Sequence, residues 1–305
     1  MTTPAAHEPV MVAEVLELIR ASRGGVFVDC TVGLGGHSRA LLEAGADRVL
    51  GLDRDLSALA FAREALASFG DRVELVHADY RELDRVLDER GLGQAAGVLA
   101  DLGVSSMQFD AEGRGFSFRR DEPLDMRMDQ SRGPSVADLL RDVEEVELAD
   151  VIYRFGEERA SRRVARAIVH ARRESPIDTT GRLAAIVRRA VPHKGHQRID
   201  PATRTFQALR IWVNRELDGL DAFLAQAARR LLAGARLAII TFHSLEDRIV
   251  KHVFRALEKA GPEPDRGAGE GLRILTKRPL VPADEEVARN PRARSAKLRA
   301  IERFA

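Results

Sequence analysis

Four aspartates in the first third of the chain each end a short apolar run, and carboxylates in such places can hold a ligand. They are Asp29, Asp53, Asp79 and Asp101. In an open parallel sheet, ligands bind outside the carboxyl ends of the strands. Four carboxylates facing one dry core would cost too much free energy, because a buried charge needs a partner. We therefore expect these acids to form a polar rim around a bound ligand.

A glycine-rich turn follows the first of these acids. Gly33 and Gly35 complete the pattern D-x-x-x-G-x-G that begins at Asp29. Glycine permits positive φ angles and close approach of the backbone to a ligand. The dinucleotide fingerprint G-x-G-x-x-G is incomplete, because Ser38 occupies its third glycine position. The looser pattern typical of S-adenosylmethionine (SAM) enzymes is complete, and a plain strand-to-helix turn is the alternative.

Residues near this turn extend the candidate site. Asp53 follows Gly33 by 20 residues, where a carboxylate can accept two hydrogen bonds from a ribose diol. Its alternative role is a helix cap. For His37 the alternative is a helix residue without a ligand, and for Tyr80 it is a core aromatic ring. Cys30, the single cysteine, is expected to be a small buried apolar residue, and no disulfide within the chain can form.

The elements that must position these residues alternate strand and helix. Strands are expected at 26–29, 49–53, 73–79 and 97–102, with helices at 37–43, 56–69 and 83–90. Short links between such elements are typical of a parallel sheet covered on both faces. The sequence therefore predicts an α/β, Rossmann-like sheet with its acids at one edge.

The alternation stops for about a hundred residues and then resumes. Residues 107–211 show helical patterns and no clear strand, so we expect a helical insertion there, dividing a sheet domain into 1–106 and 212–305. Beyond it we expect a helix at 205–232, a turn at Gly234, a strand at 237–242 and a helix at 246–259. Residues 272–276 and 296–304 are expected to form a terminal strand pair.

The net charge of +1 conceals a local concentration of arginines. Six arginines and no acid lie between residues 159 and 173. Five basic residues recur there at spacings of three and four, which places them on one helix face. They are Arg159, Arg163, Arg166, His170 and Arg173. A face of this kind favours a polyanion such as RNA, and a solvated basic helix is the alternative.

Several classes of protein are disfavoured by the same sequence. No apolar run approaches the roughly 18 residues that span a bilayer, and residues 1–10 lack the apolar segment of a signal peptide. No paired Cys or His at metal-binding spacing indicates a metal site, and no phosphate-binding G-x-x-x-x-G-K-[ST] loop is present. The expectation is a soluble, cytoplasmic protein without a metal or a membrane partner.

Motifs along nearly the whole chain, in the right order, resemble one family, the bacterial 16S ribosomal RNA cytosine-N4 methyltransferases of the MraW (small subunit methyltransferase H) type. The matching stretches are 7–11, 33–38, 52–55, 101–108, 114–118, 123–129, 153–157, 201–211, 241–248 and 290–295. Residues 261–271 and the stretch before them match least.

This resemblance implies a SAM-dependent enzyme that methylates the exocyclic N4 of a cytidine in the decoding (P-site) region of 16S rRNA in the small ribosomal subunit. It implies that the insertion recognises the RNA, and it leaves the oligomeric state, including a homodimer, open. A tyrosine stands at position 80, where the family often has phenylalanine. The implied cofactor contacts are Gly35, Gly36, His37, Asp53, Tyr80, Asp101 and Gln108.

The chemistry of N4 methylation suggests further candidates. The N4 lone pair of cytosine is delocalised, so a polar group should accept an N4 hydrogen while the methyl group stands in line. Candidates for that pocket are Asp101, Ser105 and His243. The alternative role of Asp101 is to orient the cofactor without contacting the base, and that of His243 is to cap a helix. No general base is assigned.

Four residues of the insertion are candidates for substrate contacts. Asp125 and Arg127 could close over the base, with a salt-linked loop as the alternative, whereas Arg163 and Arg166 could contact phosphates. Three other functions compete with this interpretation. They are a NAD-dependent oxidoreductase, a DNA amino-methyltransferase and a noncatalytic RNA-binding factor.

Overall fold

The computed structural model describes residues 9–104, 109, 111–191, 200–260 and 271–304. The chain forms two compact units, one of residues 1–103 and 218–305 and the other of residues 104–217. The first is called the sheet unit below and the second the helical unit. Among the described residues, no helix combines the length and the apolar character needed to cross a bilayer.

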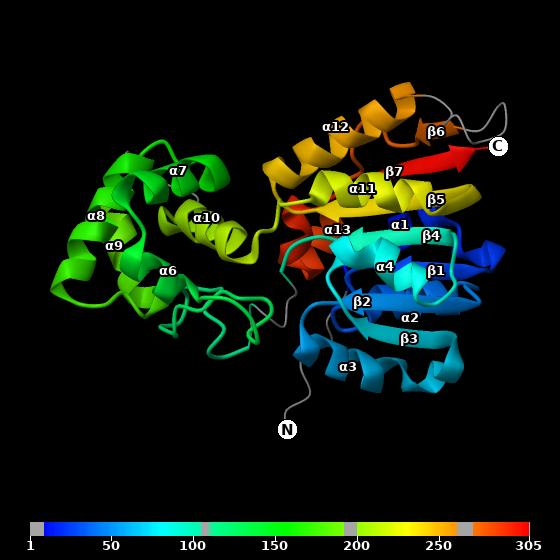
Figure 1. Cartoon of the computed structure of the whole chain (residues 1–305), viewed down its shortest axis with the longest axis horizontal. Coiled ribbons are helices and arrows are strands. Elements are labelled where there is room, and N and C mark those ends of the chain that lie inside the picture. Colours follow the sequence, from blue (N-terminus) through cyan, green and yellow to red (C-terminus); the bar gives the residue numbers. More distant parts are fainter. Residues whose placement is uncertain (1–8, 105–108, 110, 192–199, 261–270, 305) are drawn as a thin grey trace. The chain divides into compact units, whose positions relative to one another are not determined.

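The sheet unit contains a seven-stranded sheet in the order β3-β2-β1-β4-β5-β7-β6 (Figure 1). The strands are β1 Val26–Asp29, β2 Arg48–Asp53, β3 Val73–His77, β4 Ala95–Asp101, β5 Leu231–Thr241, β6 Gly271–Ile274 and β7 Lys297–Phe304. The first five pair in parallel, and β7 runs antiparallel between β5 and β6. The predicted α/β fold class and the terminal strand pair are confirmed.

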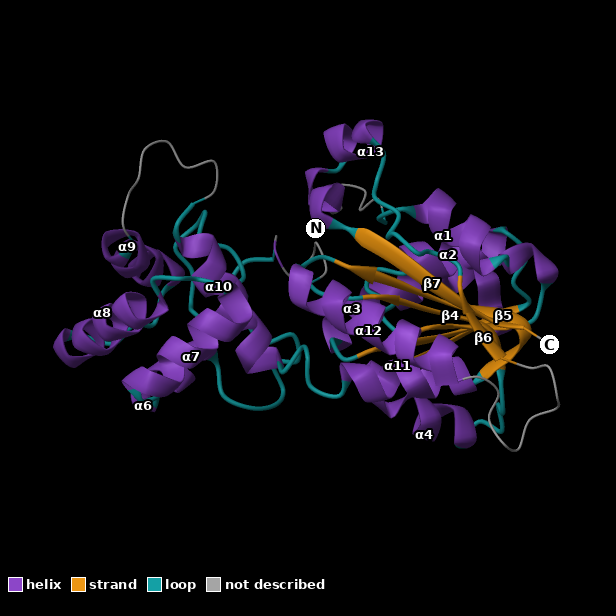
Figure 2. Cartoon of the chain, turned by 90° about the horizontal axis from the view of Figure 1, so that it is seen from above, coloured by secondary structure: helices purple, strands orange, loops and turns teal. Residues whose placement is uncertain are grey.

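Helices cover both faces of this sheet, as Figure 2 shows from above. They are α1 Val12–Ile19, α2 Gly36–Glu43, α3 Leu56–Leu66, α4 Leu83–Asp88, α11 Leu220–Arg229 and α12 Ser244–Ala260. A further short helix, α13 Asp284–Arg289, has no buried residue. Successive strand residues point to opposite faces. Phe27 of β1 accordingly packs with α1, α2 and α3, whereas Val28 packs with α4, α11 and α12. The central strands are mostly apolar between their ends because both of their faces are buried.

The helical unit has its own core. Its helices are α6 Val136–Asp142, α7 Glu145–Gly156, α8 Ser161–Glu174, α9 Thr180–Ala190 and α10 Ala202–Asn214. Its described residues form no strand beyond an isolated bridge between Pro123 and Thr179. The unit begins three residues before the predicted insertion and ends six residues after it. Trp212 and Val213 belong to α10 and pack on the helical core, so a boundary after residue 211 would cut that helix.

The expected single helix at 205–232 is wrong. Arg215 adopts a left-handed conformation with φ of 51° and ends α10, and Gly219, with φ of 67°, precedes α11. The expected turn at Gly234 is also wrong, because this residue lies inside β5. Gly234 has a φ of 79°, and the pairing of β4 with β5 shifts register nearby, so β5 begins at Leu231, before its apolar segment.

Candidate functional site

The glycine turn joins the carboxyl end of β1 to α2. Gly33 and Gly35 have φ values of 53° and 86°, a region that other residues rarely adopt. A Cβ atom on Gly36 would lie 2.8 Å from the Pro9 side chain. A Cβ atom on Gly33, in contrast, would meet no atom within 4 Å. The turn therefore needs glycine for its conformation, and it presents open backbone at Gly33.

Asp29, at the end of β1, is fully buried and holds this turn together. Its carboxylate accepts hydrogen bonds from the Ser38 hydroxyl at 2.7 Å and from the Thr31 backbone nitrogen at 3.1 Å. Burial raises the pKa of Asp29 to about 6, although these two hydrogen bonds oppose the shift. Ser38, which breaks the dinucleotide fingerprint, is thus the partner of a buried acid.

Asp53, at the end of β2, also contacts the glycine turn. One carboxylate oxygen accepts from the Gly33 backbone nitrogen at 2.8 Å and the other from the Asp55 nitrogen at 2.8 Å. Burial raises the pKa of Asp53, against the effect of these two hydrogen bonds. The cap of α3 is Asp55, which accepts from the Ser57 nitrogen, so the alternative role of Asp53 as a helix cap is wrong.

Asp79 and Tyr80 follow β3 and have partners within the sheet unit. Asp79 forms a capping box with Glu82 and an ion pair of 2.7 Å with Arg81. Burial alone would raise the pKa of Asp79, but the hydrogen bonds from Arg81 and the charges of Arg54 and Arg81 together lower it. The Tyr80 ring packs on Phe223 with 4.7 Å between centroids. The alternative of a core aromatic therefore describes Tyr80, and its cofactor contact stays a prediction.

Asp101, at the end of β4, differs from the other three acids. Its Oδ2 lies 3.7 Å from His37 Nε2, whereas its Oδ1 is buried and accepts no hydrogen bond from the described residues. Burial raises the pKa of Asp101 well above its usual value, and the neighbouring charges of Asp29 and Glu246 raise it further. A carboxylate in this state favours a cation or a hydrogen-bond donor supplied by a ligand.

Thr31 was missed by the sequence reasoning. Its hydroxyl accepts a hydrogen bond of 2.6 Å from the Asp101 backbone nitrogen, and its own backbone nitrogen donates to Asp29. Thr31 thereby fixes the ends of β1 and β4 relative to one another. The available signal was its position between a strand-end acid and the glycine turn.

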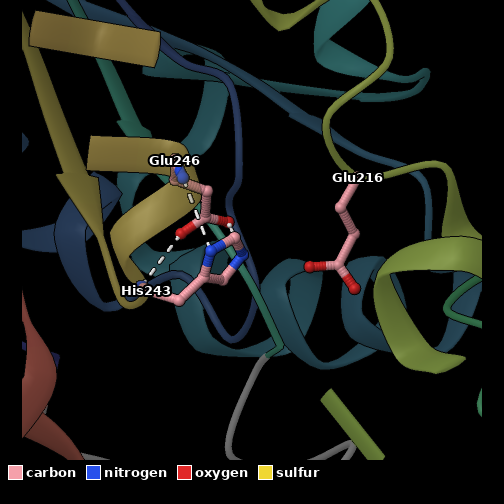
Figure 3. Close-up of side chains that lie close together, drawn as sticks. All are labelled: Glu216, His243 and Glu246. Atoms are coloured by element: carbon pink, nitrogen blue, oxygen red, sulfur yellow. Dashed lines mark hydrogen bonds and ion pairs between the residues drawn. The ribbon is translucent and has the colours of Figure 1, made fainter. Parts of the chain in front are cut away.

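His243 and Glu246 form a reciprocal cap at the start of α12. The Glu246 nitrogen donates to His243 Nδ1 at 3.4 Å, while the Glu246 carboxylate accepts from the His243 nitrogen at 3.4 Å. Figure 3 shows the ring and the carboxylate facing one another, with Nε2 and Oε1 3.2 Å apart. This is the cap that the sequence left as the alternative. Glu216, also drawn, belongs to the helical unit and pairs there with Arg210 at 2.8 Å.

In the helical unit, Asp125 and Arg127 are joined by two side-chain hydrogen bonds of 2.7 and 2.9 Å, and the Arg127 backbone nitrogen donates to Asp125 at 3.0 Å. Arg127 also donates to the Gly133 carbonyl oxygen. Because the pair ties one loop to itself, the salt-linked alternative describes it. The ion pair with Arg127 lowers the pKa of Asp125 despite its partial burial. Contact of this pair with a substrate stays a prediction.

The basic face of α8 is exposed. Arg163, Arg166, His170 and Arg173 all lie on its solvent side, while Val164 and Ile168 are fully buried on the other. Arg166 is 3.4 Å from Glu145 of α7, and His170 is 3.6 Å from Glu174. Exposed pairs of this length are worth little, so the face keeps its positive character.

The structure thus brings together most of the predicted cofactor residues that it describes. The glycine turn, His37, Asp53 and Asp101 lie at the carboxyl edge of β1, β2 and β4. Ser105 and Gln108 lie outside the described residues. The residues fit a cationic, ribose-bearing cofactor, because Asp101 has a buried oxygen without a partner among the described residues and Gly33 presents open backbone.

The strand order, the antiparallel β7 and the glycine turn after β1 define the class of protein. The fold is that of a Rossmann-like, SAM-dependent methyltransferase. Residues 4–304 match the model of the MraW methylase family, and the chain belongs to this family. The predicted family and cofactor are confirmed.

Relatives are similar in sequence to this chain over nearly its full length. A protein of Nitrobacter hamburgensis named ribosomal RNA small subunit methyltransferase H is 51% identical, covering 99% of this chain and 92% of that one. A protein of Sorangium cellulosum with the same name is 51% identical, covering 97% and 90%. A solved structure from Streptococcus mutans, a putative methyltransferase in complex with SAH, is 13% identical with a TM-score of 0.41, covering 100% and 99%. That last similarity is too distant to carry a functional argument.

Proposed function

We propose that this methyltransferase acts on 16S rRNA in the small ribosomal subunit and methylates the exocyclic N4 of a cytidine in the decoding region. The names of the relatives support ribosomal RNA of the small subunit as the substrate. The resemblance of the motifs supports the N4 position. The observation that carries the chemistry is Asp101, whose buried Oδ1 has no hydrogen-bond partner among the described residues.

Different residues of the chain bind different parts of SAM. In this proposal Asp53 and the glycine turn hold the ribose, His37 and Asp101 bind near the methyl group, and Gln108 and Tyr80 complete the predicted set. When bound, SAM supplies an electrophilic methyl group. The open turn at Gly33 lets the cofactor approach the backbone closely, because no side chain fills that space.

Methylation of N4 requires the protein to localise a delocalised lone pair. A carboxylate that accepts an N4 hydrogen does so, and it also orients the nitrogen for in-line attack. We assign this role to Asp101. Its raised pKa makes it a ready acceptor once a positive charge lies nearby, since a cation favours the carboxylate form. Ser105 is a second candidate acceptor, whereas His243 serves as the cap of α12.

No covalent step through sulfur is part of this mechanism. Methylation at an exocyclic amine needs no nucleophile on the enzyme, unlike methylation at the ring carbon C5. Cys30 is buried in the core on the α4, α11 and α12 face of the sheet, and burial raises the pKa of its thiol well above the usual value. A thiol in this environment is a weak nucleophile.

The helical unit supplies the RNA contacts in this proposal. Arg163 and Arg166 on the exposed face of α8 are assigned to phosphates, which a basic stripe attracts without regard to sequence. Asp125 and Arg127 hold their loop in shape for the substrate. The reaction is placed in the cytoplasm, where the small subunit is found.

Transfer of labelled methyl groups tests the substrate. We expect label from SAM to enter the RNA of small ribosomal subunits and not duplex DNA. Heat-denatured protein gives the background. Transfer to duplex DNA alone would overturn the RNA assignment, and SAM binding without any transfer would indicate a noncatalytic protein.

A further inference from the structure

Residues 153–159 contain the turn between α7 and α8. Packing within the helical unit accounts for some residue types in this segment but not for others. A Cβ atom on Gly156 would lie 2.5 Å from the carbonyl oxygen of Arg204 in α10, so only glycine fits there. Glu158 is 7% exposed, and its Oε1 accepts from the Ala160 nitrogen at 2.7 Å. These two residues build the turn between α7 and α8.

The turn is held in place by α10 at two further points. The Gln207 side chain donates to the Phe155 carbonyl oxygen at 3.0 Å, and Arg204 donates to the Glu157 carbonyl oxygen at 3.4 Å. Glu157 adopts a left-handed conformation with φ of 50°. The backbone at this turn is therefore held in place before any partner binds, which lowers the entropy cost of binding through its side chains.

Tyr153, in contrast, does not help to hold this turn in place. It lies in the last turn of α7 and is 60% exposed, and no described residue gives its ring an aromatic neighbour or its hydroxyl a hydrogen bond. A large ring that is left in water on a rigid helix is available for contact with a partner. Seven positions earlier, Val146 is 74% exposed on the same face of α7 and provides a comparison.

Arginines surround this position in the sequence. Arg154 follows Tyr153, and Arg159, Arg162 and Arg163 occupy the turn and the first turn of α8. All four are exposed. Two exposed acids lie about one helical turn from Tyr153, Asp150 before it and Glu157 after it, so the four arginines outnumber the acids. An aromatic ring for a base, with guanidinium groups for phosphates, is the combination that binds unpaired nucleotides.

We propose that the α7–α8 corner, consisting of Tyr153, Arg154, Arg159, Arg162 and Arg163, binds an unpaired nucleotide of the RNA substrate. The base stacks on the Tyr153 ring, and the arginines contact the neighbouring phosphates. This inference rests on the proposed function, since it assumes an RNA substrate. The charge of the corner favours a nucleic acid over an apolar protein surface.

The test is the affinity for a short, fluorescein-labelled, single-stranded oligoribonucleotide. Tyr153→Ala should weaken binding about tenfold, as expected for the loss of one stacked base. Tyr153→Phe keeps the ring and should bind as the wild type does. Val146→Ala, on the same helix face, is the matched control and should also be unchanged. The salt dependence of binding should stay the same in Tyr153→Ala, because no phosphate contact is lost.

Separate outcomes judge the corner and the proposed function. Equal affinity of wild type and Tyr153→Ala for the oligoribonucleotide would refute nucleotide binding at the α7–α8 corner. A loss confined to methylation of assembled subunits would also refute it and would indicate that the corner contacts a protein. Tyr153→Trp provides a second variant, whose added fluorescence should be quenched by the oligoribonucleotide. Failure of the wild type to methylate any RNA would refute the proposed function, while the oligoribonucleotide measurement would still judge the corner.

Discussion

Asp101 differs from the other strand-end acids in its hydrogen bonding. Asp29, Asp53 and Asp79 each accept hydrogen bonds from named groups of the sheet unit. Asp101 has His37 at 3.7 Å and a buried oxygen that no described residue satisfies. A buried polar atom without a partner is unfavourable unless a ligand completes it. We therefore propose that the reactive end of the site lies at the end of β4.

Asp101→Asn tests this assignment. We expect kcat to fall at least about a hundredfold, because the amide is a poorer acceptor for the N4 hydrogen than a carboxylate. The wild-type rate should rise with pH as Asp101 ionises through its raised pKa, and the variant should lose that rise. Steady-state kinetics across pH provide the measurement. Asp221→Asn, at an exposed site on α11, is the control, and an unaltered pH profile in Asp101→Asn would refute the role.

Asp29 provides a prediction about stability. Its pKa is about 6 in the folded state and 3.8 as the reference value, so the folded state binds the proton more tightly. The resulting stabilisation is fully present below about pH 4 and is lost as pH rises through about 6. Relative to Asp29→Asn, the wild type should lose roughly 3 kcal/mol over this range. Urea unfolding of both proteins from pH 4 to pH 7 measures the difference, and a constant difference would contradict the account.

At the scale of elements, α8 carries a cluster of exposed basic residues in the helical unit. Reversal of Arg163 and Arg166 to glutamate should weaken RNA binding and lower the slope of affinity against salt by about one to two, because up to two phosphate contacts are lost. SAM binding, measured by calorimetry, should be unchanged. A matched double reversal of Arg141 and Arg189, which are exposed on α6 and α9, should have a smaller effect. Equal loss of RNA and SAM binding would instead indicate misfolding.

The elements around the site were predictable because they follow simple patterns. Apolar runs that end in an acid located β1, β2 and β4, and the three-four spacing located α8 and its exposed face. The end of α10 was not predictable, because a left-handed Arg215 leaves no mark in the sequence, although Asp218-Gly219 was an available turn signal before α11. The partners of the acids were hidden for a related reason. Ser38 and Arg81 reach Asp29 and Asp79 only once the chain has folded.

At the scale of the whole molecule, one sheet unit is interrupted between β4 and α11 by a helical unit with its own core. This arrangement separates two kinds of charge. Acids gather at the strand ends of the sheet unit, and arginines gather on α8 of the helical unit. The net charge of +1 is therefore a sum of opposed local fields, each suited to a different ligand.

The central claim is methyl transfer to the N4 of a cytidine in the small subunit. Small ribosomal subunits that lack the modification are incubated with labelled SAM and the protein, and the RNA is then digested to nucleosides and mapped. The account predicts label in N4-methylcytidine at one site in the decoding region of 16S rRNA, and almost none with Asp101→Asn. Label in a ring-carbon methylcytidine, in another nucleoside or in the large subunit would contradict it.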